Sequence, residues 1–308
     1  MKDARLTPGA NFRPIRSLLY YVQRLVTPPR IRLLVILALR YLIRMRQGGT
    51  PCPCAPQSGD DVARLRRDGF APLQAVLSSG QCEEIRAYLL DKNMTDRVNV
   101  DTVFTLDSVP GSVHMGDYGL EDVLACPHIL DLVNHPALIG LATAYLGCKP
   151  TVSQIAMRMA FPRQTQAVSV QRFHRDADDW RYVKLIVFLS DVDQQGGPHF
   201  FVKGSHAERA PIRLKWYSDQ DIAARYGAHA IAEVTGAAGF GFVVDPAGIH
   251  KGASPTKSRR LMMQVRYSMC EVYAYDYEPV EHVDAHRFDK YINRLILKPA
   301  RANSAAPG

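Results

Sequence analysis

The pattern of apolar positions changes near residue 150 of the 308-residue chain. Before that point, apolar side chains recur every three or four residues, which predicts helices at 79–90, 120–125 and 129–146. We expect Ser79 to cap the first helix, with Glu83 and Glu84 near its amino end, where acidic groups suit the helix dipole. The polar stretch 91–117 is long for a connection in a compact domain. It therefore forms either a lid or a set of short elements that the pattern does not show.

From Thr151 onward the pattern is typical of strands. Alternation over 153–161 and an unbroken apolar run over 182–189 predict two strands, and the segments 200–202, 240–244 and 260–269 predict three more. Helices followed by many short strands favour an α+β domain. We expect a jelly-roll-like double sheet with flanking helices.

Two further apolar runs, 14–26 and 31–45, lie near the N-terminus and are separated by Pro28-Pro29, which no helix can run through. Neither run reaches the roughly 20 apolar residues of a membrane span, and Arg40 interrupts the second run. One interpretation is a pair of basic helices that lie on an anionic membrane surface or bind a partner. The other is a helical hairpin packed on the domain, with its arginines reaching outward. An arginine-rich transit sequence is a third alternative.

Residues 48–56 are rich in Gly and Pro, and this composition predicts a linker. The expected organisation is a basic helical extension at 1–47, a linker at 48–60, a globular domain at 61–300 and a disordered tail at 301–308.

The formal charge of +8 is unevenly distributed. Residues 1–48 contain ten Lys and Arg and one Asp, giving +9, so the rest of the chain carries 8 − 9 = −1. The basic character belongs to the extension, and the domain is not expected to bind nucleic acid. The six cysteines are scattered, and the close pair Cys52 and Cys54 lacks a second pair for a zinc site. We therefore expect a reducing, cytoplasmic location, with peripheral membrane attachment if the extension binds lipid.

The candidate chemistry centres on His174 and Asp176 in the segment 173–178. In an extended strand, residues i and i+2 point to the same face, so this pair aims one imidazole and one carboxylate at a common point. These groups are two of the three ligands of the 2-His-1-carboxylate triad of non-haem Fe(II) oxygenases. His250, at the end of 244–250, fits as the third ligand. The rival pair His282 and Asp284 has no histidine-and-arginine arrangement downstream of it.

Neighbouring polar residues have simpler expected roles. Arg175 points away from the ligand face and is expected to pair with an acid. Asp178 and Asp179 are expected to be solvated or to face the substrate. Lys184 and Arg158 are expected on solvated strand faces, with contact to cosubstrate or substrate as the alternative.

Four segments between about residues 62 and 269 together resemble the phytanoyl-CoA dioxygenase family of Fe(II)/2-oxoglutarate oxygenases. Residues 65–70 and 77–82 are similar to the start of its domain, and 174–176 to its first metal motif. Residues 196–206 resemble its turn-strand-turn ending in Gly-Ser-His, where His206 is a structural element, and His250 with 258–261 and 266–267 resembles its closing motif. Gly196 stands where the family often has Asn, and Phe173 where it often has Trp. Residues 1–48 lie outside the resemblance.

The resemblance implies a double-stranded β-helix, or cupin-like, core in which His174, Asp176 and His250 bind iron. Three protein ligands leave three iron positions, two for the keto acid of 2-oxoglutarate and one for O₂. An arginine is expected to bind the far carboxylate, because guanidinium offers two parallel hydrogen bonds. Arg259 and Arg260 compete for that role, and the family spacing and the strand face shared with Arg266 favour Arg260.

The function expected from the resemblance is an Fe(II)- and 2-oxoglutarate-dependent dioxygenase. It would hydroxylate an aliphatic carbon of a small-molecule or lipid-like substrate and release succinate and CO₂. The carboxylate of Asp176 argues against a halogenase, in which that position is small. One alternative is a non-catalytic membrane-associated protein on an oxygenase-like scaffold, which the intact ligand set disfavours. The other is a cupin-like metalloenzyme such as an isomerase, which would not need an arginine after the distal histidine.

Overall fold

The computed structural model describes residues 2–3, 13–47, 58–162, 171–208 and 215–300. Of the predicted linker at 48–60, residues 48–57 lie outside the described residues, as does the predicted tail at 301–308, whereas residues 58–60 already begin the helix α3 (Ser58–Asp68). Helices and antiparallel sheets are mixed along the chain, in agreement with the predicted α+β class.

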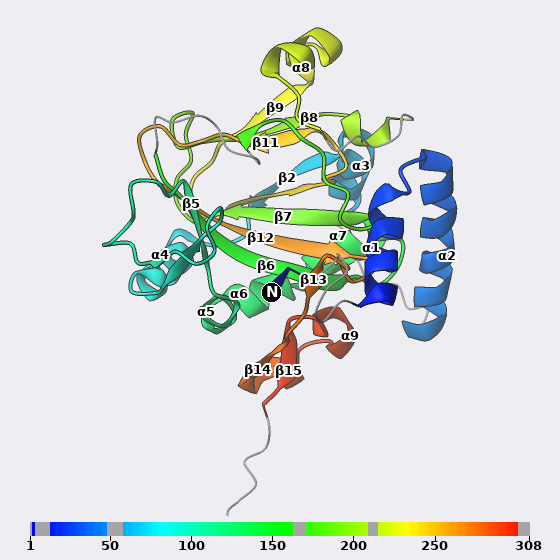
Figure 1. Cartoon of the computed structure of the whole chain (residues 1–308), viewed down its shortest axis with the longest axis horizontal. Coiled ribbons are helices and arrows are strands. Elements are labelled where there is room, and N and C mark those ends of the chain that lie inside the picture. The colour runs from blue at the N-terminus through cyan, green and yellow to red at the C-terminus, as the bar shows by residue number, and fades with distance from the viewer. Residues whose placement is uncertain (1, 4–12, 48–57, 163–170, 209–214, 301–308) are drawn as a thin grey trace, which may run out of the picture.

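Two sheets form the centre of the molecule, and Figure 1 shows the smaller one above the larger one. The larger sheet has eight antiparallel strands, in the order β2 (Phe70–Ala75), β10 (Phe240–Val244), β7 (Tyr182–Phe188), β12 (Arg260–Ser268), β6 (Thr151–Ala160), β5 (Met115–Tyr118), β3 (Met94–Asp96) and β4 (Val103–Phe104). The smaller sheet has the antiparallel order β11 (His250–Gly252), β8 (His199–Val202) and β9 (Ile231–Val234).

Strand β7 shows how the sequence fills the space on both faces of the large sheet. Val183, Leu185 and Val187 pack into the core shared with the helices, whereas Ile186 and Phe188 pack into a second core with residues of β8 and β10. Because successive side chains of a strand point to opposite faces, an unbroken apolar run is needed for a strand buried on both sides. The strand predicted from the apolar run at 182–189 is therefore present and buried on both faces.

Helices cover the outer face of the large sheet (Figure 1). They are α3 (Ser58–Asp68), α4 (Ser79–Leu89), α5 (Leu120–Ala125), α6 (Ile129–Val133) and α7 (Pro136–Leu146), with α8 (Asp219–Tyr226) near the small sheet and α9 (Lys290–Asn293) near the C-terminal end. The remaining strands are β1 (Lys2–Asp3), β13 (Tyr275–Asp276), β14 (Val280–His282) and β15 (Leu297–Pro299).

Two local predictions for the helices are wrong. The cap of α4 is Ser78, not Ser79, because the Ser78 side chain accepts from the Gln81 backbone N–H and the Gln81 side chain accepts in return. The helix predicted at 129–146 is two helices, because Pro136 has no N–H to continue the first and instead starts the second. This stretch is apolar and long enough to span a membrane by composition, but 61% of it is buried inside the protein, as a core helix would be.

The polar stretch 91–117 contains short elements rather than forming a lid. β3, β4 and the start of β5 extend the large sheet past β6, and residues of this extension line the main cavity. Strands of two to four residues leave too few positions for a recognisable alternation.

The N-terminal segment forms two helices, α1 (Pro14–Leu25) and α2 (Pro29–Gln47), which lie side by side at one end of the sheets (Figure 1). The hairpin packs on the domain, and Ile36 and Ile43 join its main core. The expectation that the arginines of such a hairpin reach outward is wrong for Arg32, which is 6% exposed. Its guanidinium donates to the carbonyls of Gln23, Val26, Asp179 and Trp180. These hydrogen bonds offset the free-energy cost of burying the charge.

Candidate metal centre

The metal motif and the distal histidine are brought together by backbone pairing. His174 and His250 form an isolated antiparallel bridge, and the Asp176 backbone N–H donates to the carbonyl of Pro246 at 2.9 Å. The segment 174–176 is thereby added alongside β11, at the edge of the small sheet. Because His174 and Asp176 are two residues apart in an extended segment, both side chains face the same side as His250.

The three side chains form the one cluster of metal-binding type found among the described residues, with ligand atoms within 4.8 Å of one another. The Asp176 carboxylate lies 3.5 Å from Nε2 of His174 and 3.7 Å from Nε2 of His250. Two imidazole nitrogens and one carboxylate oxygen on one side of a site are the donor set that non-haem Fe(II) prefers. The residues therefore fit an iron ion.

Both histidines are oriented by their second ring nitrogen. Nδ1 of His174 lies 2.8 Å from the carbonyl of Arg172, and Nδ1 of His250 lies 3.0 Å from the carbonyl of Gly248. A carbonyl can only accept, so the proton belongs on Nδ1 and the lone pair of Nε2 is free for a metal.

The electrostatics of the cluster also suit a cation. Burial alone would raise the pKa of Asp176, but Lys184, which donates to its Oδ2, and the two histidines hold that pKa well below its usual range. Burial, followed by the charge of His174, lowers the pKa of His250 to about 3. The site thus offers an ionised carboxylate and a neutral imidazole.

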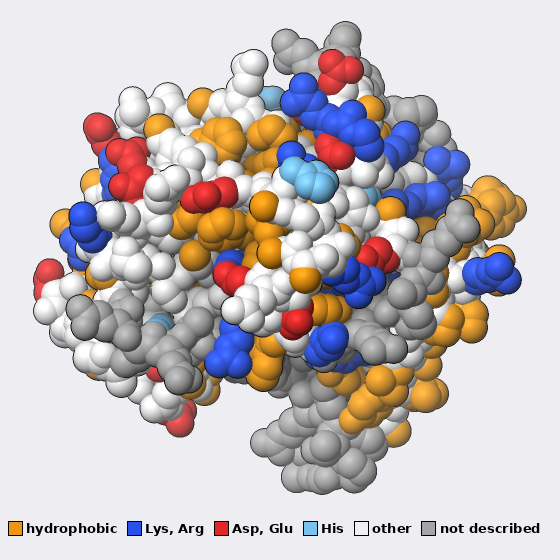
Figure 2. All heavy atoms as spheres, turned by 90° about the horizontal axis from the view of Figure 1, so that it is seen from above, with side chains coloured by type: hydrophobic (Ala, Val, Ile, Leu, Met, Phe, Trp, Pro, Cys, Tyr) orange, Lys and Arg blue, Asp and Glu red, His pale blue; other side chains and the backbone are white. Residues whose placement is uncertain are grey.

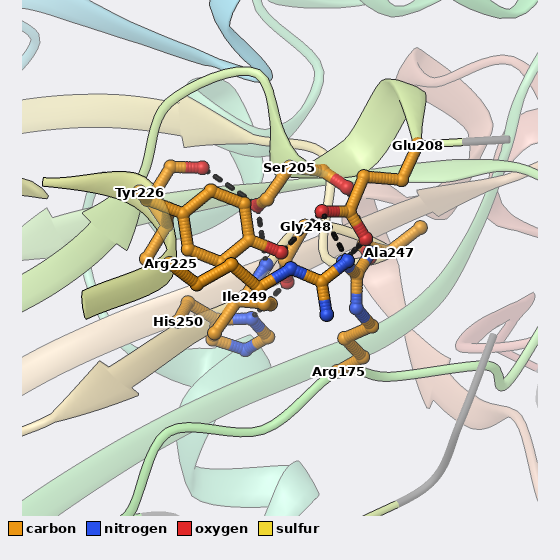
Figure 3. Close-up of polar contacts among 10 residues, drawn as sticks. Arg175, Ser205, Glu208, Arg225, Tyr226, Ala247, Gly248, Ile249 and His250 are labelled. Carbon is orange, nitrogen blue, oxygen red and sulfur yellow. Dashed lines mark hydrogen bonds and ion pairs between the residues drawn. The ribbon is translucent and has the colours of Figure 1, made fainter. Parts of the chain in front are cut away.

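Arg175, between the two ligands of the motif, fixes the loop that leads to His250 (Figure 3). Its guanidinium donates to the carbonyl of Ala247 at 2.6 Å and to that of Ser205 at 2.8 Å, and it pairs with Glu208. Ser205 Oγ in turn accepts from the Ile249 backbone N–H at 2.8 Å. The predicted acid partner of Arg175 is therefore Glu208. Ser205, in the Gly-Ser-His turn, holds the backbone of the loop 245–249 that precedes His250.

His206, the last residue of that turn, contacts the start of the domain rather than the metal cluster. Its Nε2 lies 3.1 Å from the carbonyl of Arg66, and its ring packs where a side chain at Gly69 would stand. The structural role expected for His206 agrees with this position.

A cavity of about 800 Å³ opens in front of the cluster, between the two sheets and the 91–118 extension. Its walls carry five cationic and four acidic side chains, Arg97, Arg158, Lys184, Arg260 and Arg266 with Asp96, Asp117, Asp176 and Asp178. Most of these cations have acid partners: Arg158 and Arg97 contact Asp117, Arg266 contacts Asp178, and Lys184 contacts Asp176.

Arg260 differs from the other cations of the cavity because no carboxylate of the described residues pairs with it. It is 2% exposed, its Nη1 donates only to the carbonyl of Ala253 at 3.3 Å, and its Nε has no partner. Burial, then the charge of Arg158, lowers its pKa to about 10. A buried guanidinium without a counter-charge is costly, so an anion at this position would be favoured. The alternative, Arg259, is exposed.

Three expectations for the neighbouring residues are wrong. Arg158 is buried and contacts Asp117, and Lys184 contacts Asp176, so neither lies on a solvated strand face. Asp179 is 1% exposed and accepts from the backbone N–H groups of Met269 and Cys270. Of the two acids after the motif, only Asp178 lines the cavity.

Sequence reasoning missed the cavity residues Arg97, Asp117 and Tyr275. The first two belong to the polar stretch whose short strands were not recognised. Tyr275 lies beyond the segments that carried the motifs, and no pattern in the sequence singles it out. Among the described residues, the rival pair belongs to no cluster of metal-binding type. His282 and Asp284 lie in a local turn, in which His282 Nδ1 accepts from the Asp284 backbone N–H.

Comparison with protein families matches residues 65–261 to the model described as phytanoyl-CoA dioxygenase (PhyH). Among solved structures, the fold is similar to that of the non-haem α-ketoglutarate-dependent epimerase SnoN from nogalamycin biosynthesis. The identity is 21% and the TM-score 0.51, over 69% of this chain and 83% of that one. SnoN in complex with Fe³⁺, α-ketoglutarate and nogalamycin RO gives 22% identity and a TM-score of 0.50, over 69% and 83% of the two chains. Comparison with curated proteins gives no significant match.

The fold and the family match together define an iron- and 2-oxoglutarate-dependent oxygenase with a double-stranded β-helix core. The chain belongs to the phytanoyl-CoA dioxygenase family, whose model covers well over half of it. The predicted fold, enzyme class and cofactors, Fe(II), 2-oxoglutarate and O₂, are thereby confirmed.

Proposed function

We propose that the protein hydroxylates an aliphatic carbon of a polar small molecule, with His174, Asp176 and His250 as the iron ligands and Arg260 as the 2-oxoglutarate anchor. The observation that carries this proposal is that a three-ligand cluster and a buried guanidinium, which has no acid partner among the described residues, open into the same cavity. When bound, iron and 2-oxoglutarate supply the oxidation of a C–H bond by O₂, with succinate and CO₂ as the other products.

The protein side chains divide the work of binding. Arg260 offers its guanidinium to the far carboxylate of 2-oxoglutarate. Two glycines leave space beside this guanidinium, because a Cβ at Gly197 would stand 3.1 Å from Nη1 and a Cβ at Gly252 would stand 3.5 Å from Nη2. His199, on β8, lines the same cavity, and its buried Nε2 has no hydrogen-bond partner in the described part of the chain. Burial, then the charge of His250, holds the pKa of His199 well below its usual range, so a neutral ring can donate to a cosubstrate oxygen.

The substrate side of the cavity is formed by the 91–118 extension. Here two guanidinium groups, Arg97 and Arg158, share the single carboxylate of Asp117, at 3.3 Å and 2.5 Å. Arg97 is the more exposed of the two, with a side chain 35% accessible. The accessible guanidinium of Arg97 favours a substrate that carries a hydrogen-bond-accepting group. That group would bind Arg97 while the reactive carbon of the substrate faces the iron ligands.

The described cysteines, Cys82, Cys126, Cys148 and Cys270, all carry free thiols, which supports a reducing cytoplasmic location. An anionic membrane surface as a second partner is a separate proposal, and it rests on the N-terminal hairpin.

Succinate formation from 2-oxoglutarate by the purified full-length protein tests the proposed function. We expect turnover that requires Fe(II) and O₂, rises with a true substrate, and is lost in Asp176→Ala. The matched control is Asp284→Ala, from the rival pair, which should retain wild-type turnover. Equal turnover by the wild type and Asp176→Ala would contradict the assigned site.

A further inference from the structure

We propose that the outer face of the α1–α2 hairpin is a docking surface for an anionic lipid membrane. This hairpin face is made of exposed apolar residues on both helices, Ile15, Leu18, Leu19, Tyr21, Val22, Leu25, Ile31, Leu33, Leu34, Leu37, Tyr41, Leu42 and Met45. The proposal does not depend on the proposed hydroxylation, because no residue of the hairpin face lines the catalytic cavity.

The polarity of helix α1 is the reverse of that of an ordinary surface helix. Its buried residues are Ser17 and Gln23, whereas Ile15, Leu18 and Leu25 are 63–75% exposed. Ile15, Leu18, Leu19, Val22 and Leu25 follow the three- and four-residue spacing of one helical stripe, so they form a continuous apolar face. That stripe points away from the domain.

Two inward-facing polar residues, Gln23 of α1 and Arg32 of α2, hold this orientation through specific hydrogen bonds. The Gln23 side chain donates to Asp179 at 3.0 Å and to the carbonyl of Glu271 at 3.1 Å, and it accepts from the Tyr273 backbone N–H. Arg32 of α2 donates to four carbonyls and lies over the Trp180 ring at 5.4 Å. Turning either helix over to bury its leucines would leave these buried acceptors without donors.

The apolar exposure is concentrated on the hairpin. Thirteen of the nineteen exposed large hydrophobic residues of the described chain lie on these two helices. Figure 2 shows hydrophobic side chains gathered at the right-hand edge, where Figure 1 places α1 and α2, with basic side chains among them. Contiguous apolar surface of this kind marks an interaction site rather than the scattered exposure of an ordinary surface.

The charge of the hairpin selects an anionic membrane as the occupant. Residues 13–47 contain no Asp or Glu, and Arg30, Arg44 and Arg46 are exposed without an ion pair among the described residues. A second copy of the hairpin would bring like charges together with no acid between them. Lipid headgroups supply negative charge in the same plane as an apolar layer, which matches arginines beside leucines.

The hairpin would lie flat on the membrane instead of crossing it. Arg32 and Arg40 on α2 point to the domain, where Arg40 contacts the carbonyl of Leu146. Helix α2 therefore cannot be surrounded by lipid while these contacts persist, and the contacts of Gln23 hold α1 to the domain in the same way. Tyr21 and Tyr41 on the outer face suit the headgroup layer, where amphipathic rings are favoured.

Co-sedimentation of the full-length protein with vesicles tests the proposal directly. We expect binding to vesicles of mixed phosphatidylglycerol and phosphatidylcholine, and at least about tenfold weaker binding to phosphatidylcholine alone. Added salt should weaken the binding, because exposed charges are screened. The double variant Leu18→Glu, Leu34→Glu should lose binding by about tenfold or more, since both side chains are over 60% exposed and the variant removes apolar contact while adding repulsion.

The matched control is Leu90→Glu, Val283→Glu, which places the same charges at exposed apolar positions outside the hairpin. It should bind vesicles as the wild type does, and both double variants should retain the wild-type melting temperature. The proposal is overturned if the wild type ignores anionic vesicles at low salt, or if both double variants bind equally. It is also overturned if the wild type is a dimer that the hairpin variant alone dissociates, because the face then belongs to a second copy.

Discussion

His174 and His250 exchange both of their backbone hydrogen bonds, at 3.0 Å each, although 76 positions separate them in the chain. This bridge fixes the register of the 174–176 segment against the strand that carries the distal histidine. A slip of one residue would turn His174 and Asp176 to the opposite face. The geometry of the candidate iron site is thus a property of strand pairing.

Replacement of Arg260 tests the cosubstrate assignment. Arg260→Leu should raise the 2-oxoglutarate concentration needed for half-maximal turnover by an amount equivalent to roughly 2–5 kcal/mol, because the cosubstrate carboxylate would be buried without its partner. Iron binding should persist, as Arg260 is not a ligand. Arg259→Leu is the control. Because Arg259 is exposed, its replacement should leave the 2-oxoglutarate requirement unchanged. Steady-state kinetics in which Arg259→Leu, and not Arg260→Leu, raises the 2-oxoglutarate requirement would assign the carboxylate-binding role to Arg259.

Removal of the Arg175 side chain tests the support of the metal loop. Arg175→Met should lower the free energy of unfolding by roughly 3–5 kcal/mol, because a buried charge pair and two carbonyl contacts are lost together. Iron affinity should fall as well, since the loop before His250 loses its anchor.

The control for this prediction is Arg225→Met, which removes the other arginine that contacts Glu208. Its side chain is 57% exposed, so a change of no more than about 1 kcal/mol is expected. Urea unfolding and iron titration of both variants give the answer. Similar destabilisation by the two would mean that Glu208, rather than the loop carbonyls, is the important partner.

Asp179 gives a prediction for pH. Burial raises its pKa to about 6, although four N–H donors favour the ionised form. A pKa raised above the unfolded value of about 3.9 means that its favourable contribution is complete below pH 4 and is lost as pH rises through 6. The free energy of unfolding should therefore fall by on the order of 3 kcal/mol across this window from this group alone.

Asp179→Asn should remove that slope, and it should also destabilise the protein at every pH, because an amide NH₂ would face backbone N–H donors. Asp107→Asn, at an exposed position, is the control. Urea unfolding between pH 4 and 7 checks both points. A variant with an unchanged slope would show that Asp179 is ionised throughout.

The sequence predicts those parts of the fold in which local pattern and burial agree. The strand at 240–244 and the helix at 120–125 have the predicted bounds, because both are short segments with clear limits. The grouping of His174, Asp176 and His250 was also predictable, since extended spacing and motif order carry it.

The remaining features depend on tertiary context that no local pattern contains. Arg32 and Gln23 are buried because their partners lie far away in the sequence. These partners are the Asp179 carboxylate and backbone groups of residues 179–180 and 271–273. An amphipathic helix is ordinarily placed with its apolar stripe toward the core. In α1, by contrast, the side facing the domain carries the polar residues Ser17 and Gln23. The expectation that Asp179 is solvated or faces the substrate is wrong for the same reason, because two of its four donors, the backbone N–H groups of Met269 and Cys270, lie about 90 positions further along the chain.

The measurement that tests the central claim most directly is anaerobic Fe(II) titration of the full-length protein with 2-oxoglutarate present. We predict one iron per chain for the wild type and for His282→Ala, and none for His174→Ala or Asp176→Ala, with every variant folded by circular dichroism. Iron binding that survives in the 174 and 176 variants but is lost in His282→Ala would contradict it.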